Sequence, residues 1–159
     1  MTSIDEELAD LVTESVNPAY ALLDTMSVAE LAAAMNQADA SVAPAVRAAL
    51  PSIAAAIEAA ATRMQAGGRL VYVGAGTAGR IGVVDASECP PTFSTPPEQV
   101  FAIMAGGANA IVHPTEGAED DTQAGARAVD EAAVGPLDTV VGIASSGRTP
   151  YVLGAIERA

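Results

Sequence analysis

The feature that most constrains this chain is an apolar run that stops at a glycine-rich turn, RLVYVGAGTAGR at 69–80. Residues 70–73 are apolar and favour β structure, and the run ends at Gly74. Thr77 then follows as a residue able to cap a helix. The pattern predicts a buried strand, a glycine turn and a helix start at the carboxyl edge of a parallel sheet, where ligands usually bind. A plain strand-turn-helix without a ligand is the alternative.

Strands alternate with helices along the rest of this part of the chain. Apolar runs at 100–106 and 139–145 predict two further strands. Helices are expected over about 77–87, over about 115–133 and from Thr149 onwards. The strands are continuous apolar runs, as expected where helices cover both faces of a sheet. We therefore predict an α/β fold with a doubly wound, flavodoxin-like parallel sheet.

The first third of the chain has a helical pattern. Helices are predicted over 3–24, 27–39 and about 43–66. The second is opened by Ser27 with Glu30 three residues later, which is the capping-box spacing. This segment could cover a sheet or pair with a second subunit, and we expect a homodimer.

The predicted elements suggest two parts: an N-terminal helical segment at 1–66 and the first part of an α/β domain at 67–159. Pro51 either bends the third helix or marks its true start, and Gly67-Gly68 end it. Three strands make a narrow sheet, whereas doubly wound domains usually have about five or more. The sheet is therefore expected to be truncated, and the chain to be the first half of a larger protein.

Composition excludes several classes of function. A formal charge of −13, with seven arginines and no lysine, offers no basic stripe, so no nucleic-acid partner is expected. The amino terminus is acidic where a secretory signal would be basic, and no run of about 18 apolar residues occurs. We expect a cytoplasmic protein without a membrane partner. The lone Cys89 has no Cys or His neighbour at metal-ligand spacing, so no metal site is predicted.

Gly74, Gly76 and Gly79 satisfy the GxGxxG fingerprint of dinucleotide-binding domains. That fingerprint also needs an acidic residue at the end of the second strand, to hold the ribose hydroxyls. Here the second strand ends in MAGG at 104–107, with no acid in place. A nucleotide cofactor is therefore not expected.

A second polar turn, SSGRTP at 145–150, also joins the end of a strand to the start of a helix. Hydroxyls and free N–H groups around a helix N-terminus make a phosphate cradle. Alternatively, Thr149 simply caps the helix and Pro150 occupies its first turn. We favour phosphate binding because two such turns open on the same sheet edge. The residues expected to hold the ligand are Gly76, Thr77, Ser145, Ser146 and Thr149.

Two groups of acids near that edge are candidates for chemistry. Glu88 is predicted to lie between a helix end and two prolines, where the helix dipole disfavours a carboxylate. The acids of TEGAEDD at 115–121 are favoured by the dipole at a helix start and need no catalytic reason to be there. The residues alone leave open which of these acids acts.

Several stretches agree in order and spacing with one enzyme family. GAGTAGR (74–80), DASECPPTF (85–93), EGAEDD (116–121), ASSGRTPY (144–151) and TESVNP (13–18) resemble motifs of the N-acetylmuramic acid 6-phosphate etherases. These are lyases built on sugar-isomerase (SIS) domains. The resemblance covers the whole chain and about the N-terminal half of the family's length. Ala78 stands where the family commonly has serine.

The resemblance implies cleavage of the D-lactyl ether of N-acetylmuramic acid 6-phosphate to N-acetylglucosamine 6-phosphate and D-lactate, in cell-wall amino-sugar recycling. Elimination would be followed by addition of water, without a metal or redox cofactor. Carried over by motif, Glu88 is the acid that protonates the departing ether oxygen and Glu119 is the base at C2. His113 either assists ring opening or is incidental. Two other functions stay open: a sugar-phosphate-sensing regulator resembling the glucokinase regulatory protein, and a SIS-type aldose–ketose isomerase.

Overall fold

The computed structural model of the chain describes residues 11–159. Its internal contacts divide the chain into two compact units, Met1–Ile57 and Glu58–Ala159. The domain boundary expected after residue 66 stays a prediction.

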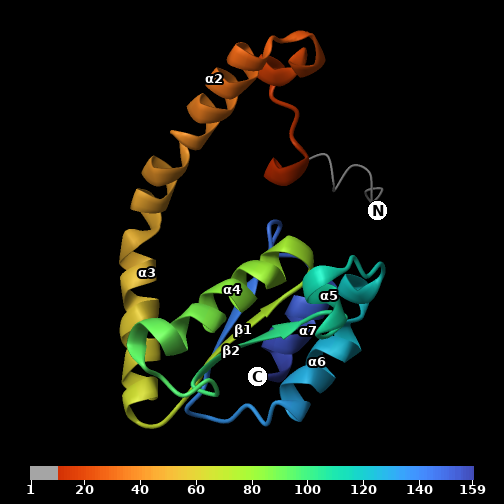
Figure 1. Ribbon diagram of the computed structural model, residues 1–159. Helices are drawn as coiled ribbons and strands as arrows, with labels where there is room; N and C mark the ends of the chain where they lie inside the picture. Colours follow the sequence, from red (N-terminus) through yellow and green to blue (C-terminus); the bar gives the residue numbers. More distant parts are fainter. Residues whose placement is uncertain (1–10) are drawn as a thin grey trace, which may run out of the picture. The chain divides into compact units, whose positions relative to one another are not determined.

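The first unit consists of short helical turns followed by long helices (Figure 1). Its elements are η1 (Val12–Glu14), η2 (Pro18–Tyr20), η3 (Leu23–Thr25), α2 (Val28–Asp39) and the greater part of α3 (Val42–Gln65). None of the residues between 11 and 57 whose exposure is described is buried. This unit therefore has no apolar core of its own in its described part.

The helix predicted over 3–24 is wrong where the structure describes it, and residues 1–10 lie outside the described part. Pro18 is the physical reason. It removes an N–H donor and disfavours helical geometry in the residue before it, so Asn17 is extended with φ −84° and ψ 116°. The Asn17 side chain accepts a hydrogen bond from the Ala19 N–H at 3.0 Å, which starts a new short turn.

The other two predicted helices of this segment are confirmed. Ser27 and Glu30 form the expected capping box, with the Ser27 N–H donating to Glu30 Oε2 at 2.8 Å. Pro51 lies inside α3 and does not mark its start. The helix ends at the glycine pair, where Gly67 has φ +95° and the Gly68 N–H donates to the Arg63 carbonyl at 2.9 Å.

One helical stretch of the described chain, 28–65, is long and apolar enough by length and composition to cross a membrane. No residue of this stretch is buried. A core helix of a soluble protein or a signal sequence meets the same test, so this is weak evidence. The expected lack of a membrane partner stays a prediction.

The second unit is a parallel sheet between helices (Figure 1). Its elements are the end of α3, β1 (Leu70–Gly74), α4 (Gly76–Phe93), β2 (Val100–Met104), α5 (Asn109–Val112), η4 (Ala118–Asp120), α6 (Thr122–Glu131), β3 (Thr139–Ile143) and α7 (Pro150–Arg158). The three strands are parallel in the order β2-β1-β3, so the strand that feeds the glycine turn lies in the middle. In this register Gly74 lies opposite Met104 on one side and Ile143 on the other.

Helices cover both faces of this sheet. α4 lies against the face that carries Tyr72, since a Cβ added at Gly82 would be 2.8 Å from the Tyr72 Cβ. The opposite face carries Val71 and Val73, both fully buried, and packs against α6 and α7. The buried cluster on that side is Val71, Val73, Ala75, Ala105, Val129, Tyr151 and Ala155. The predicted α/β fold with helices on both faces is confirmed.

Two glycines of the GxGxxG pattern are explained by close packing of α4 on β1. A Cβ added at Gly79 would lie 2.8 Å from the Gly74 carbonyl carbon and 2.4 Å from Met104 Sδ. A Cβ added at Gly74 would lie 2.6 Å from the Gly79 Cα. The helix can approach the strand this closely only because both residues lack a side chain.

α4 differs from its predicted form at both ends. Ala75 is the N-cap residue, so Thr77 lies within the first turn and does not cap the helix. The helix also continues through Pro90 and Pro91 to Phe93. Each proline removes one N–H donor from the helix, but its fixed φ is helical, and the last turn closes through the Ser94 N–H, which donates to the Pro90 carbonyl at 2.9 Å.

The helix predicted over 115–133 begins later, at Thr122. Gly117 has φ +71°, which interrupts any helix before it, and η4 follows as a single short turn. Asp121 then caps α6, because its Oδ1 accepts a hydrogen bond from the Ala124 N–H at 2.8 Å. Glu119 therefore lies in a turn before the helix and not in its first turns.

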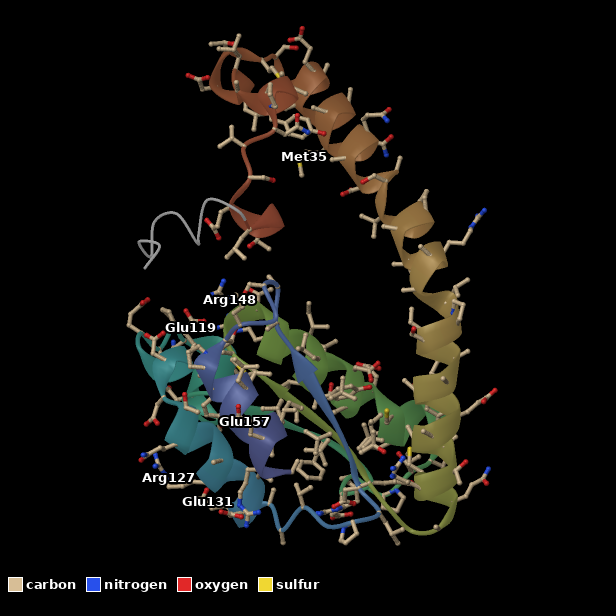
Figure 2. The ribbon with its side chains drawn as sticks, turned by 180° about the vertical axis from the view of Figure 1, so that it is seen from behind. Met35, Glu119, Arg127, Glu131, Arg148 and Glu157 are labelled. Carbon is tan, nitrogen blue, oxygen red and sulfur yellow. The ribbon has the colours of Figure 1, made fainter. Side chains whose placement is uncertain are left out.

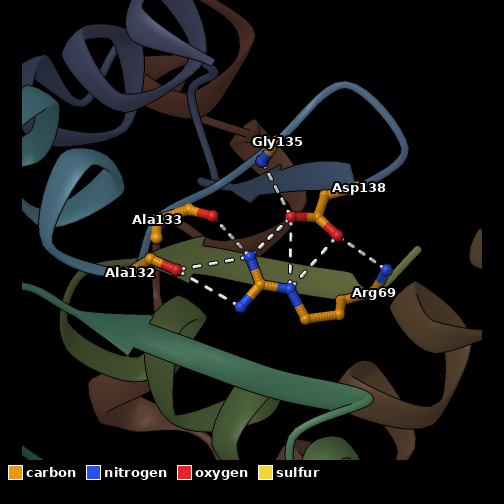
Figure 3. Close-up of polar contacts among 5 residues, drawn as sticks. All are labelled: Arg69, Ala132, Ala133, Gly135 and Asp138. Atoms are coloured by element: carbon orange, nitrogen blue, oxygen red, sulfur yellow. Dashed lines mark hydrogen bonds and ion pairs between the residues drawn. The ribbon is translucent and has the colours of Figure 1, made fainter. Parts of the chain in front are cut away.

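The amino end of the sheet is fastened by Arg69 and Asp138, which precede β1 and β3 (Figure 3). The Arg69 Nε donates to both Asp138 carboxylate oxygens at 3.1 and 3.2 Å, and its backbone N–H donates to Asp138 Oδ1 at 2.8 Å. The same guanidinium donates to the Ala132 and Ala133 carbonyls. The Gly135 N–H donates to Asp138 Oδ2 at 2.9 Å. The two residues thus join β1, β3 and the end of α6.

Candidate active site

The turns that follow the three strands meet at one edge of the sheet, because the strands are parallel and in register. Each turn contains glycine with a positive φ: +53° at Gly76, +81° and +69° at Gly106 and Gly107, and +68° at Gly147. Such turns leave backbone N–H groups free to face a ligand. The expectation that the two polar turns open on the same edge is confirmed, and the loop after β2 joins them there.

A pocket of about 180 Å³ lies between the turn after β1 and the loop after β2, and we call it the edge pocket. Its lining residues are Ala75, Gly76, Arg80, Met104, Ala105, Ala110, Pro114, Thr115, Glu116, Gly117, Ala118 and Glu119. The pocket therefore brings Gly76 and Glu119 together, two residues predicted from the sequence to serve the site.

Among the acids of 115–121, Glu116 and Glu119 line the edge pocket, whereas Asp121 is committed to helix α6 and to Arg127. The Glu119 side chain is exposed and has no hydrogen-bond partner among residues 11–159. Its carboxylate is thus available to a ligand. The sequence left open which of these acids acts. In the structure, Glu116 and Glu119 line the pocket, whereas Asp121 has a structural role.

Glu88 lies elsewhere on the molecule. It is exposed on α4, in a second pocket of about 430 Å³ that is lined by Thr77, Arg80, Ile81, Val84, Asp85 and Glu88. α4 runs back toward the amino end of the sheet. Glu88 comes twelve residues after Gly76, so it lies about 18 Å from Gly76 along the helix axis. The predicted placement of Glu88 at a helix end near the sheet edge is therefore wrong. Its catalytic role stays a prediction.

Thr77 also belongs to this second pocket and not to the edge pocket. Beneath it the face of α4 is fixed to the sheet by Tyr72, whose O–H donates to Asp85 Oδ2 at 2.6 Å. Cys89 is half-buried, and its thiol donates to the Asp85 carbonyl at 3.4 Å. Burial raises the pKa of Cys89, as expected for a structural cysteine. No group of three or more His, Cys, Asp or Glu among residues 11–159 is placed to hold a metal ion.

The predicted phosphate residues after β3 lie in the turn before α7. Ser145 and Ser146 are exposed, and Ser146 Oγ accepts a hydrogen bond from the Arg148 N–H at 3.2 Å. Thr149 occupies the N-cap position of α7, but its side chain makes no capping hydrogen bond. The alternative that Thr149 serves simply as a helix cap is therefore not supported. Its hydroxyl is free to meet a ligand.

Arg148 adds a positive charge to this turn. Figure 2 shows Arg148 and Glu119 at the same end of the α/β unit. The Arg148 guanidinium forms no salt bridge among residues 11–159, whereas Arg69, Arg127 and Arg158 are paired with aspartates. In a chain with a formal charge of −13, an available cation at this edge favours an anionic ligand.

Comparison of the sequence with known proteins identifies the family of the chain. A family model of the glucokinase regulatory protein N-terminal SIS domain matches residues 52–159. The chain belongs to this SIS family. The match includes all three strands and every residue predicted for the site.

Three relatives are similar over nearly the whole chain, and each is named N-acetylmuramic acid 6-phosphate etherase. The chain is 53% identical over 156 residues to the protein of Rubrobacter xylanophilus, covering 98% of the chain and 52% of the relative. It is 53% identical over 158 residues to that of Salinibacter ruber, covering 99% and 51%. For Gloeobacter violaceus the identity is 54% over 153 residues, covering 96% and 50%. The chain thus spans about half the length of these curated relatives, and the resemblance to their N-terminal half is confirmed.

Sequence reasoning missed Arg80, which lines both pockets. The available signal was its position as the last residue of GAGTAGR, one helical turn beyond Gly76. The His113 side chain does not line the edge pocket, although the His113 carbonyl accepts a hydrogen bond from Arg80 at 3.5 Å.

Proposed function

We propose that the protein to which this chain belongs is an etherase that cleaves N-acetylmuramic acid 6-phosphate into N-acetylglucosamine 6-phosphate and D-lactate. The observation that carries the proposal is Glu119, an unpaired acid in a pocket beside the Gly76 turn. It occurs in a chain that is about half identical to proteins named for this reaction. A phosphorylated sugar is an intracellular substrate, which fits a cytoplasmic role in recycling amino sugars of the cell wall.

The proposed reaction is an elimination followed by an addition. Opening of the sugar ring gives an aldehyde at C1, which makes the proton at C2 acidic. Glu119 removes that proton, the C2–H electron pair forms the C2–C3 double bond, and the C3–O bond to lactate breaks. Glu88 gives its proton to the departing oxygen, and water then adds at C3. Each positioned proton transfer is worth about 10² to 10⁴ in rate, so a poor leaving group can depart.

In the proposed complex the phosphate lies at the sheet edge. The free hydroxyl of Thr149 and the exposed hydroxyls of Ser145 and Ser146 would donate to it, with N–H groups of the turns completing the cradle. Arg148 in the same turn would offset the negative charge of the chain. Gly76 has nothing within 4 Å of an added Cβ, which supports open space for a ligand next to its backbone.

The separation of the two glutamates gives the proposal a further requirement. Glu88 and Glu119 line different pockets of one chain, so they can act on one substrate only if another chain or the rest of the protein brings them together. A homodimer in which Glu88 of one subunit faces Glu119 of the other would meet this requirement. If Glu88 has no role, Glu116 is the second acid within the edge pocket itself.

A second candidate is a regulator that senses sugar phosphates without cleaving them. The family match supports this candidate, because the matching family model is named for the glucokinase regulatory protein. Such a protein would use the same phosphate cradle but would need no base at C2. An aldose–ketose isomerase would need the base but no acid at the ether oxygen.

Lactate release by the full-length protein distinguishes these functions. We expect D-lactate from N-acetylmuramic acid 6-phosphate and little from the unphosphorylated sugar. A regulator would bind the substrate without lactate release, and an isomerase would convert an aldose phosphate to a ketose phosphate. Equal cleavage of the unphosphorylated sugar would exclude the proposed phosphate cradle.

The roles of the glutamates are tested by isosteric variants. Glu119→Gln should abolish lactate release together with exchange of the C2 proton in deuterated solvent. Glu88→Gln should reduce lactate release by about 10² or more while exchange persists, because the base is intact. If Glu88 acts across a dimer, mixing the two inactive variants should restore lactate release in mixed dimers. Wild-type activity of Glu88→Gln would remove this residue from the mechanism.

A further inference from the structure

The Arg80 side chain donates to three backbone carbonyls of one short segment and forms no ion pair among residues 11–159. Its Nε donates to the Ile111 carbonyl at 2.9 Å, and its NH2 group donates to the Ala110 carbonyl at 2.8 Å and to the His113 carbonyl at 3.5 Å. By contrast, Arg69 and Arg158 are paired with aspartates. The Arg80 guanidinium therefore bonds to the backbone of one short segment.

The accepting carbonyls belong to the end of α5, a helix of only four residues. So short a helix is not stable alone, and the carbonyls of its last turn have no partner within it. The planar guanidinium donates to these carbonyls from two separate nitrogens, whereas lysine has a single donor nitrogen. Figure 1 shows the beginning of α4, which carries Arg80, next to α5. The side chain thus joins the glycine-turn helix to this segment.

The same segment forms one wall of the edge pocket. Arg80, Ala110 and Glu119 all line it, and only the stretch 114–118 separates the last accepting carbonyl from Glu119. Pro114 restricts that stretch, so a shift at His113 would be passed on toward the acid. The position of Glu119 relative to the Gly76 turn therefore depends on the contacts of Arg80.

From these contacts we infer that Arg80 is a positioning residue, which fixes segment 109–119 against α4 and so holds Glu119 at the edge pocket. This inference rests on the proposed function, because it gives Glu119 the role of base. It assigns Arg80 no direct contact with the reacting atoms. The bonds that its Nε and one terminal nitrogen make all go to backbone carbonyls of this segment, which is why a structural role is inferred and not a catalytic one.

The inference is tested in the full-length protein with Arg80→Gln and Arg80→Lys. The control is Arg63→Gln, because among residues 11–159 the Arg63 side chain donates to the Ala59 carbonyl of its own helix. Hydrogen–deuterium exchange of peptides covering 109–119 reports the order of the segment without a substrate. Steady-state kinetics with N-acetylmuramic acid 6-phosphate then separates kcat from KM.

For Arg80→Gln we expect exchange in 109–119 to become at least about tenfold faster, because charged hydrogen bonds to three carbonyls are lost. We expect kcat to fall by at least about tenfold while KM changes by less than about threefold, since a misplaced base slows chemistry more than phosphate binding. Arg80→Lys keeps the charge and one donor nitrogen, so its exchange rate and kcat should lie between those of Arg80→Gln and wild type. The Arg63 control should match wild type.

Unchanged exchange in both Arg80 variants would overturn the inference, and so would a raised KM at constant kcat, which would indicate direct substrate binding. If Arg80→Gln does not fold, Arg80→Lys supplies the same comparison. If the wild-type protein releases no lactate, the proposed function fails, but the exchange measurement still decides whether Arg80 holds the segment. The two failures are thus distinguishable.

Discussion

Replacing Asp138 by Asn should destabilise the fold through loss of one charge. Asparagine keeps the shape and an acceptor oxygen, so the Gly135 N–H retains a partner while the Arg69 guanidinium loses its counter-ion. The Asp138 side chain is 7% exposed and that of Arg69 is 29% exposed, so solvent cannot fully replace the lost partner.

The size of the effect follows from the titration of Asp138. Its side-chain hydrogen bonds with Arg69 lower the pKa of Asp138 from 3.8 to about 2, with smaller contributions from the Gly135 and Arg69 backbone N–H groups. A pKa lowered this far corresponds to roughly 2 kcal/mol of stability. Screening at the partly exposed Arg69 reduces this, so we expect Asp138→Asn to cost about 1 to 2 kcal/mol at pH 7.

The sign of the pH dependence follows from the same pKa. Because the folded-state pKa is below the unfolded value, the stabilisation is fully present above pH 4 and is lost as the pH falls from about 4 to 2. Urea denaturation of the full-length protein at several pH values measures it. The difference between wild type and Asp138→Asn should shrink toward zero over that range.

The matched control is Asp130→Asn, since Asp130 pairs with Arg158 at the surface, where both side chains are more than half exposed. We expect that control to change stability by less than about 0.5 kcal/mol. An Asp138→Asn protein as stable as the control at pH 7 would refute the reasoning. So would a destabilisation that stays constant from pH 7 down to pH 2.5.

Two further predictions concern the packing of α4. Gly79→Ala should cost about 1 to 3 kcal/mol in urea denaturation, because the new Cβ would lie 2.8 Å from the Gly74 carbonyl carbon, which cannot move freely. In Gly76→Ala the new Cβ has open space, so only the positive φ should lower stability, by about 1 kcal/mol. Equal losses of stability in both variants would contradict the packing argument. Tyr72→Phe should cost about 1 kcal/mol through the lost hydrogen bond to Asp85. Burial and Asp85 raise the pKa of Tyr72, so only the wild type should lose this stabilisation as the pH rises above about 10, which denaturation at pH 8 and pH 11 would show.

The sequence was informative where a local pattern decides the structure. The apolar run that stops at Gly74 and the capping box at Ser27 both occur as predicted, because each depends on neighbouring residues. The three parallel strands follow from their continuous apolar composition. The shared sheet edge then follows from parallel pairing, so the general place of the site was predictable.

The sequence was less informative where distant residues decide the structure. Arg69 and Asp138 are far apart in the chain, and the Arg80 contacts with carbonyls of α5 depend on how α4 and the loop after β2 pack. A helix end before Pro90 and Pro91 is the local prediction, and it misplaces Glu88 because α4 continues to Phe93. Local propensity does not show that α4 stays helical through both prolines to Phe93.

The central claim is that the protein removes the C2 proton of N-acetylmuramic acid 6-phosphate in order to expel lactate. Proton NMR of the full-length protein with this substrate in deuterated buffer reads both events in one experiment. We predict that D-lactate appears together with N-acetylglucosamine 6-phosphate that carries deuterium at C2. Lactate release with the C2 proton fully retained in the product would contradict the account, and so would substrate that stays intact while it binds.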